Sequence, residues 1–218
     1  MTFRWDIILE YAPFLLKGTL LTIGLSLSGI VLGTALGLMV GLGKMMRNRW
    51  LALPFNAYVT FFRGTPLFVQ ILLIHFGVVP LFSGETNAVA AAVIALSFNA
   101  AAYIAEIFRA GIQSIDKGQM EAARSLGMSH VQAMKYVILP QASKRMIPPL
   151  GNEFVVLIKE SSLAAIIAAP EMMYWGRAMA GQYFRVWEPY LTAAVIYLIL
   201  TISLSFLLNR LERRLQTE

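Results

Sequence analysis

The sequence predicts an all-α integral membrane protein with five transmembrane helices and a short cytoplasmic helix, in one domain that covers residues 1–218. Hydrophobic residues make up 58% of the chain and charged residues only 14%, whereas soluble domains carry roughly 25% charged residues. Several apolar stretches reach about 20 residues, the length at which a helix crosses a bilayer. The chain has no cysteine, which excludes disulfides, zinc–thiolate sites and a cysteine nucleophile.

The predicted spans follow the apolar stretches, at about residues 14–42, 53–81, 88–111, 147–169 and 190–208. In the first span, glycine recurs every four residues at positions 29, 33, 37 and 41. Because this spacing places the glycines on nearly one helix face, we expect another helix to pack closely there. Ahead of Pro13, the stretch "WDIILEYA" is expected to form a separate short amphipathic helix at the outer interface.

Lysine and arginine residues are distributed unequally between the two sides of these spans. Twelve of the eighteen lie on one side, four lie on the other, and Arg63 and Lys159 fall inside spans. Cytoplasmic loops carry the excess of positive residues, so we expect an outer N-terminus, a cytoplasmic C-terminus and a cytoplasmic loop at about residues 114–140. Because these positive residues cluster beside the apolar spans, the net charge of +6 indicates a multi-pass membrane protein that contacts lipid, and not a nucleic-acid-binding protein.

The second span contains an interruption, "FFRGTPLFVQ". Gly64 is conformationally permissive and Pro66 has no N–H to donate, so the helix is expected to lose regularity here. Non-helical backbone at membrane depth is tolerated where it lines a cavity or lies buried in protein. Arg63, next to this break and to Thr65, can hold a carboxylate through its forked N–H donors. The alternative is a structural ion pair between Arg63 and an internal acid such as Glu106.

The third span carries three polar residues on one helix face, because Asn99, Tyr103 and Glu106 follow in steps of four and three. In the fourth span, polar residues lie in pairs seven residues apart, which predicts a polar stripe along one side of the helix. Both patterns also fit a polar seam between packed helices. The stripe consists of Asn152, Glu153, Lys159 and Glu160, and Ser161 and Ser162 extend it.

Ionisable groups at membrane depth are costly and usually face a bundle interior, a partner or a water-filled cavity. We therefore predict a polar site between the helices near the midplane that binds a zwitterion, with donors for a carboxylate and carboxylates for an ammonium group. Glu153 or Glu160 would favour a substrate with a cationic side chain. The predicted substrate-binding residues are Arg63, Thr65, Asn99, Tyr103, Glu153, Lys159, Glu160, Ser161 and Ser162.

We expect no cofactor, metal or catalytic residue on this chain. His75 and His130 have no partner at metal-ligand spacing. A phosphate-binding loop of the Gly-x4-Gly-Lys-Ser/Thr type is missing, because Gly43 and Lys44 are followed by Met45. If ATP drives transport, ATP and magnesium therefore bind a separate ATPase chain.

The cytoplasmic loop carries start and stop signals for two helices. Asp116-x-x-Gln119 and Ser129-x-x-Gln132 are capping-box patterns, each at the start of a predicted helix. Gly127 can adopt the left-handed conformation that ends the first helix, and Pro140 is expected to end the second.

The first of these helices combines an apolar stripe with the polar side chains of Glu121 and Arg124. This combination fits a docking element for a water-soluble partner, and a plain amphipathic helix on the membrane surface is the alternative. The stripe consists of Met120, Ala123 and Leu126.

A longer pattern runs through the loop, Glu121-Ala122-Ala123-x3-Gly127-x9-Val137-Ile138-Leu139-Pro140. It resembles the "EAA" loop of the inner-membrane permease subunits of bacterial ABC importers. The stretches "FFRGTPLFVQ", "NAAAYIAEIFRAGIQSIDKGQMEAARSLGM", "ILPQA" and "KESSL" are similar to the polar amino-acid uptake branch of that family, so the resemblance covers nearly the whole chain.

The resemblance implies that the first helix is a coupling helix that fits a cleft on the ATPase subunit. It also implies three partners: an ATP-binding ABC subunit dimer, a second permease copy or paralogue, and an extracytoplasmic solute-binding protein that docks around the outer loops with Arg177 and Arg185. The residues expected to contact the ATPase are Glu121, Ala122, Ala123, Leu126 and Gly127.

The function expected from residues and resemblance together is the inward transport of polar amino acids. The acid at Glu153 favours arginine, lysine or histidine, while glutamine and glutamate remain open. An ion-gradient-driven secondary transporter is an alternative, although no half-to-half repeat is evident. A membrane enzyme lacks a convergent nucleophile and base, and a scaffold subunit would not need the intramembrane charges.

Overall fold

The computed structural model describes residues 3–216, and within this range every regular element is a helix. In chain order the elements are α1 (Trp5–Lys44), α2 (Arg49–Gly64), α3 (Leu67–Leu73), the π-helix η1 (Ile74–Val78), α4 (Val79–Ser83), α5 (Ala88–Gln113), α6 (Lys117–Ser125), α7 (His130–Ala133), the π-helix η2 (Met134–Ile138), α8 (Leu139–Glu160), the 3-10 helix η3 (Ser161–Ile167), α9 (Met172–Tyr183) and α10 (Trp187–Gln216).

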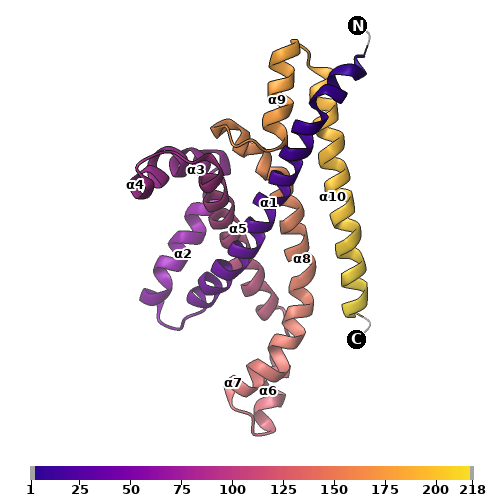
Figure 1. Cartoon of the computed structure of the whole chain (residues 1–218). Coiled ribbons are helices and arrows are strands. Elements are labelled where there is room, and N and C mark those ends of the chain that lie inside the picture. Colours follow the sequence, from indigo (N-terminus) through magenta and orange to yellow (C-terminus); the bar gives the residue numbers. More distant parts are fainter. Residues whose placement is uncertain (1–2, 217–218) are drawn as a thin grey trace.

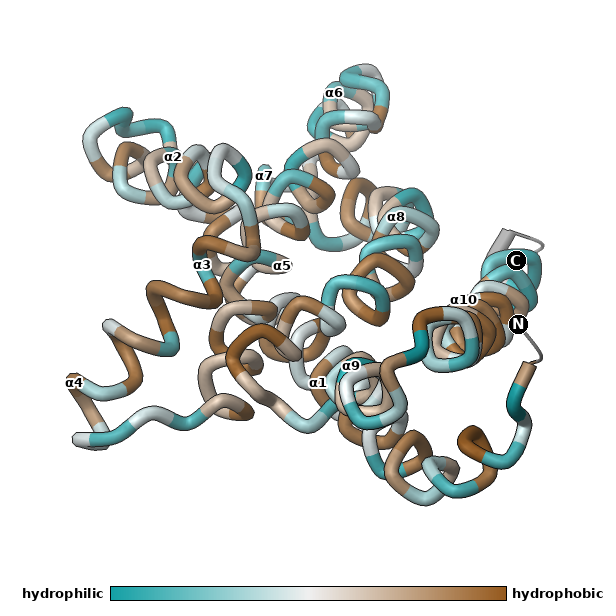
Figure 2. The backbone as a smooth tube through the Cα atoms, turned by 90° about the horizontal axis from the view of Figure 1, so that it is seen from above, coloured by the Kyte–Doolittle hydropathy of each residue, from teal (hydrophilic) through white to brown (hydrophobic). Residues whose placement is uncertain are grey.

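The helices form a bundle with one short arm at each end and one at the side. Figure 1 shows α6 and α7 projecting at one end, while α9 and the first turns of α1 and α10 lie at the opposite end. The view from above places the arm of α3 and α4 on the side opposite to α10, with α1, α5, α8 and α9 between them (Figure 2). The cytoplasmic loop of the sequence prediction is thus a distinct projection from the bundle.

Three helices are long and apolar enough to cross a membrane: α1, α5 and α10 through Arg214. The pair of α2 and the segment Leu67–Ser83 counts as a fourth span only as a bent unit, because the chain changes direction by 109° between the two parts. The predicted second span is therefore not one straight helix. Helix α8 has 22 residues but is too polar to meet the same criterion, so the count of five spans stays a prediction.

Helix α1 begins at Trp5 and continues through Pro13 without interruption. The expectation of a separate short helix before Pro13 was therefore wrong. Ile7, Tyr11 and Leu15 recur every four residues on one face and are buried against Met179 of α9. Burial of this face on both sides of the proline offsets the roughly 3 kcal/mol that an interior proline costs a helix.

Pro140 does not end a helix, contrary to the sequence prediction, because a π-helix precedes it. The Leu139 N–H donates to the Met134 carbonyl, five residues back, and the chain then runs on as α8. The other π-helix, η1, stands in the same relation to Pro80, with the Val79 N–H bonded to the Ile74 carbonyl. A proline ring clashes with the carbonyl four residues before it, and a wider turn gives the ring room while the helix continues.

The predicted glycine face of α1 packs against α5, as expected. A methyl group placed on Gly33 would lie 2.8 Å from the Ala100 Cβ, and one placed on Gly37 would lie 2.9 Å from the Ala101 carbonyl oxygen. The two backbones approach this closely only because the glycines have no side chain. The largest buried apolar cluster extends from this contact into α3 and α8 and includes Leu25, Ile71, Leu96, Ile104 and Leu157.

We predict that Gly37→Val disrupts the contact between α1 and α5. The new side chain would overlap backbone and the Ile104 Cβ, 2.9 Å away, so we expect a loss of about 1–3 kcal/mol or more in the free energy of unfolding. The measurement is the thermal unfolding midpoint of the purified complex in detergent. Gly24→Val is the matched control, since Gly24 of the same helix has no such atom within 4 Å; equal losses in both variants would contradict the prediction.

Candidate functional site

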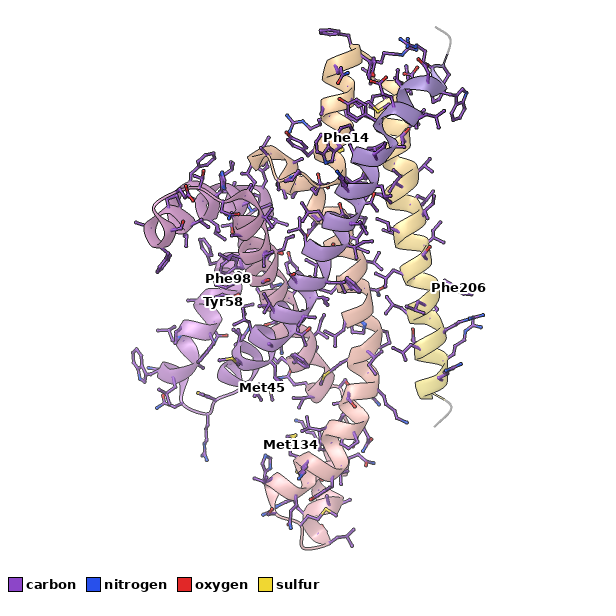
Figure 3. All side chains as sticks on the ribbon, in the orientation of Figure 1. Phe14, Met45, Tyr58, Phe98, Met134 and Phe206 are labelled. Atoms are coloured by element: carbon purple, nitrogen blue, oxygen red, sulfur yellow. The ribbon has the colours of Figure 1, made fainter. Side chains whose placement is uncertain are left out.

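The site begins at the corner between α2 and α3, where the chain turns by 109°. Helix α2 ends at Gly64, Thr65 is extended, and Pro66 precedes the first turn of α3. Arg63 therefore lies in the last turn of α2, directly before the corner. Tyr58 of α2 fixes this helix to α5, because its hydroxyl donates to the Phe98 carbonyl at 2.6 Å, and Figure 3 shows the two side chains close together.

A cavity of about 450 Å³ opens between α2, α5 and α8. Three helices contribute to its wall, so residues far apart in the sequence face the same space. Its lining residues are Arg63, Tyr103, Glu106, Ile107, Ala110, Pro149, Asn152, Glu153 and Val156.

Glu106 is the centre of a cluster of positive charges at this cavity. Its carboxylate accepts hydrogen bonds from Lys44 of α1 and from Arg109, whose Nη2 lies at 2.7 Å. Arg63 is more distant, with its Nη1 3.9 Å from the Glu106 Oε2, and its guanidinium lies 5.3 Å from the centre of the Tyr103 ring. The ion pair between Arg63 and Glu106 expected from the sequence is within range, but Lys44 and Arg109 already satisfy the carboxylate. Arg63 thus retains donors for a second anion.

Glu153 lines the same cavity from α8. Among the described residues, no lysine or arginine lies within ion-pair distance of its carboxylate. An isolated carboxylate away from water is costly unless a cation joins it. The cavity therefore combines a guanidinium with spare donors and a carboxylate without a protein cation.

Three of the predicted binding residues, Arg63, Tyr103 and Glu153, meet at this cavity. Lys159 lies on α8 but lines a different hollow, together with Thr201 and Ser205 of α10. Glu160, two turns beyond Glu153, is not among the residues that line the cavity.

The remaining predicted binding residues make hydrogen bonds within the protein. The hydroxyls of Thr65, Ser161 and Ser162 donate to the carbonyl oxygens of residues 61, 158 and 159. Asn99 is buried and its amide donates to the Gln70 Oε1 at 2.9 Å. None of these four side chains lines the cavity.

Gln70 and Glu171 are among the buried polar residues that the sequence interpretation missed. Gln70 is 2% exposed and bonds the corner between α2 and α3. Glu171 is fully buried and accepts from the Tyr174 N–H at 2.8 Å, the Tyr197 hydroxyl at 2.8 Å and the Thr22 hydroxyl at 3.2 Å. An acid directly after Pro170 and before a helix is a helix-start signal that could have identified Glu171, whereas nothing in the local sequence around Gln70 indicated its role.

Helix α6 is the helix that the sequence predicted at the start of the cytoplasmic loop. The Asp116 side chain caps it by accepting from the Gly118 N–H at 2.7 Å. In the expected reciprocal bond, the Gln119 side chain would accept from the Asp116 N–H. This bond is not present, and the Gln119 Oε1 accepts from the Gln141 Nε2 at 3.2 Å instead. The second capping box, between Ser129 and Gln132, is present in both directions.

Helix α6 ends at a left-handed turn. Gly127 has φ of 85°, and the Met128 N–H donates to the Ala123 carbonyl at 3.2 Å while the Gly127 N–H donates to the Arg124 carbonyl at 3.0 Å. This pair of bonds is the Schellman motif, which ends helices at glycine. The predicted contact residues divide by burial: Ala123 is buried, whereas Glu121, Ala122 and Gly127 are exposed and Leu126 is 81% exposed.

Comparison with known proteins places the chain in a family. Residues 7–217 match the family described as binding-protein-dependent transport system inner membrane component. The chain is 38% identical to the glutamine transport system permease protein GlnP of Escherichia coli (strain K12), over 99% of each chain. It is 37% identical to the arginine transport system permease protein ArtQ of Bacillus subtilis (strain 168), over 94% of each chain.

A solved structure described as an amino acid ABC transporter with histidines is similar over 98% of this chain and 100% of that one, with a TM-score of 0.92 and 41% sequence identity. The chain therefore belongs to the binding-protein-dependent transport system inner membrane components, as a permease subunit of a polar amino-acid ABC importer whose ATPase is a separate chain.

Proposed function

We propose that this permease moves polar amino acids into the cell and favours those with a cationic side chain: arginine, lysine and histidine. The observation that carries the proposal is the charge pattern of the cavity between α2, α5 and α8. Arg63 retains donors for the substrate's α-carboxylate, since Lys44 and Arg109 already satisfy Glu106. Glu153 lines the same cavity and attracts a cationic side chain.

Two of the similar proteins support cationic amino acids as substrates. The permease ArtQ is named for arginine, and the similar solved structure is described as an amino acid ABC transporter with histidines; both amino acids have basic side chains. The glutamine permease GlnP supports the second candidate, a glutamine or glutamate importer. Glutamate would bring a second carboxylate toward Glu153, so glutamine is the better of these two substrates by charge.

The proposal for energy coupling places α6 in a cleft of the partner ATPase dimer. Exposed Glu121, Ala122 and Leu126 offer contact atoms, and the turn at Gly127 sets the end of the helix. The buried side chain of Ala123 faces the permease, so its small size would allow α6 to pack closely against the rest of the permease. Membership in the family implies the ATPase and a binding protein as partners; a second permease subunit, an outer N-terminus and a cytoplasmic C-terminus are parts of the proposal.

We predict that Glu153→Gln reduces the preference for arginine over glutamine. Removal of the carboxylate's charge from the cavity weakens a charge-assisted contact, so the ratio of the two affinities should fall roughly tenfold. The measurement is equilibrium binding of both amino acids to the purified permease–ATPase complex. Glu160→Gln is the matched control on the same helix, because Glu160 does not line the cavity. An unchanged ratio in Glu153→Gln would refute the proposed preference for cationic substrates.

We predict that Gly127→Val uncouples ATP hydrolysis from transport, whereas Gly127→Asn retains coupling. The left-handed conformation at this position is strained for a β-branched residue, while asparagine adopts it comparatively readily. The measurement is the number of substrate molecules accumulated per ATP hydrolysed in proteoliposomes with the partner ATPase and binding protein. Normal coupling in the valine variant would show that the turn does not set the docking geometry.

A further inference from the structure

We infer that Gln70 and Asn99 are positioning residues that hold Arg63 at the substrate cavity. The inference rests on the proposed function, in which Arg63 binds the substrate's carboxylate. Neither residue lines the cavity, so both would act through the backbone on either side of Arg63.

The corner between α2 and α3 leaves backbone carbonyls without helical partners. The last four carbonyls of a helix have no intrahelical N–H to accept from, and in α2 these belong to residues 61–64. At membrane depth no water is available to replace the missing bonds, so side chains must supply them. The carbonyl of Phe61 accepts from the Thr65 hydroxyl at 2.8 Å. The next carbonyl in the chain, that of Phe62, requires a different donor.

Gln70 bonds both sides of the residue that faces the cavity. Its Nε2 lies 2.9 Å from the Phe62 carbonyl oxygen, before Arg63 in the chain. The same atom lies 3.1 Å from the Thr65 carbonyl oxygen and 2.9 Å from the Thr65 hydroxyl, after Arg63. One amide group thus fixes the backbone immediately before and after the Arg63–Gly64 pair.

Asn99 connects this corner to the helix that carries Tyr103. Its Nδ2 donates to the Gln70 Oε1 at 2.9 Å and approaches the Phe62 carbonyl oxygen at 3.4 Å. Tyr103 is one helical turn further along α5 and has the Arg63 guanidinium over its ring. The two amides therefore set the position of the Arg63 backbone relative to the ring on which its side chain rests.

Burial makes this arrangement specific to amide side chains. Gln70 is 2% exposed and Asn99 is 4% exposed, and a buried acceptor that loses its donor has no water to replace it. The Gln70 amide is donor and acceptor at once, because its Nε2 bonds the corner while its Oε1 accepts from Asn99. A methionine of similar size would fill the space but leave the Phe62 and Thr65 carbonyls and the Asn99 amide without these bonds.

The test compares binding of arginine with binding of agmatine, which is arginine without its carboxylate. Both compounds are titrated onto the purified permease–ATPase complex without the binding protein. We expect Gln70→Met to weaken arginine binding roughly fivefold to tenfold, the effect of losing about one ordinary hydrogen bond. Agmatine binding should change by less than about twofold, because agmatine makes no contact with a carboxylate site.

Four further variants complete the design. Arg63→Met should remove the preference for arginine over agmatine, and the double variant Arg63→Met with Gln70→Met should lose no more than Arg63→Met alone. Asn99→Ala should shift the preference in the same direction as Gln70→Met and serves as the second variant if Gln70→Met does not assemble. Ile71→Val is the matched control, because Ile71 is equally buried on α3 and makes none of the bonds at the corner.

A purely structural role gives a different pattern. If Gln70→Met and Asn99→Ala weaken arginine and agmatine equally, or if the losses from Arg63→Met and Gln70→Met add, the inference is overturned. If the unmodified complex prefers arginine and Arg63→Met removes this preference while Gln70→Met does not, only the positioning role fails. If Arg63→Met leaves the preference intact, the carboxylate role of Arg63 in the proposed function fails, and the positioning role fails with it.

Discussion

The architecture depends on one constraint: backbone polar groups at membrane depth must find partners inside the protein. The interior of an unbroken helix meets it by its own hydrogen bonds, and side chains supply partners at two interruptions of this chain. At the corner between α2 and α3, Thr65 bonds the Phe61 carbonyl, and Gln70 and Asn99 bond the Phe62 carbonyl. Before α9, Glu171 accepts from the Tyr174 N–H and the Thr22 hydroxyl accepts from the Met172 N–H. In both places one of the bonding side chains, Asn99 or Thr22, comes from a helix far away in the sequence. The bonds at each interruption therefore also join distant helices.

A related constraint, that a charged side chain away from water needs a partner, separates the two acids that line the cavity. Glu106 is matched inside the protein by Lys44 and Arg109, and its charge is already balanced before any substrate arrives. Glu153 has no such partner among the described residues, although it lines the same cavity. A buried ion pair that is complete within the protein mainly fixes the helices, whereas an acid without a partner gains from a cationic ligand. Under the proposed function, this contrast leaves Arg63 for the carboxylate and Glu153 for the cationic group of a zwitterionic substrate.

The sequence predicted the elements well where local pattern decides the structure. The glycine face of α1 follows from the spacing of the glycines, and the left-handed turn at Gly127 follows from conformational preference. It failed where a distant contact decides: α9 covers the face of α1 around Pro13 and keeps that helix whole. Helical spacing also predicts which residues share a helix face, but it does not predict which neighbouring element that face contacts. Asn99 and Tyr103 share a face of α5, yet one is buried against Gln70 and the other lines the cavity.

The connection between the projecting loop and the cavity follows from which helices are continuous. Ile115, before α6, packs with Ile138, Ala142 and Met146 along η2 and α8, and Gln119 bonds Gln141 at 3.2 Å. Because η2 lets the chain pass Pro140 as a helix, α8 runs from this contact to Glu153 without a break. Arg63, in contrast, is tied through Gln70 and Asn99 to α5. Under the proposed coupling, a movement of α6 is therefore transmitted directly to the helix that carries the acid. Such a movement would change the distance between Glu153 and Arg63. It would therefore change the affinity of the cavity for a substrate that must contact both residues.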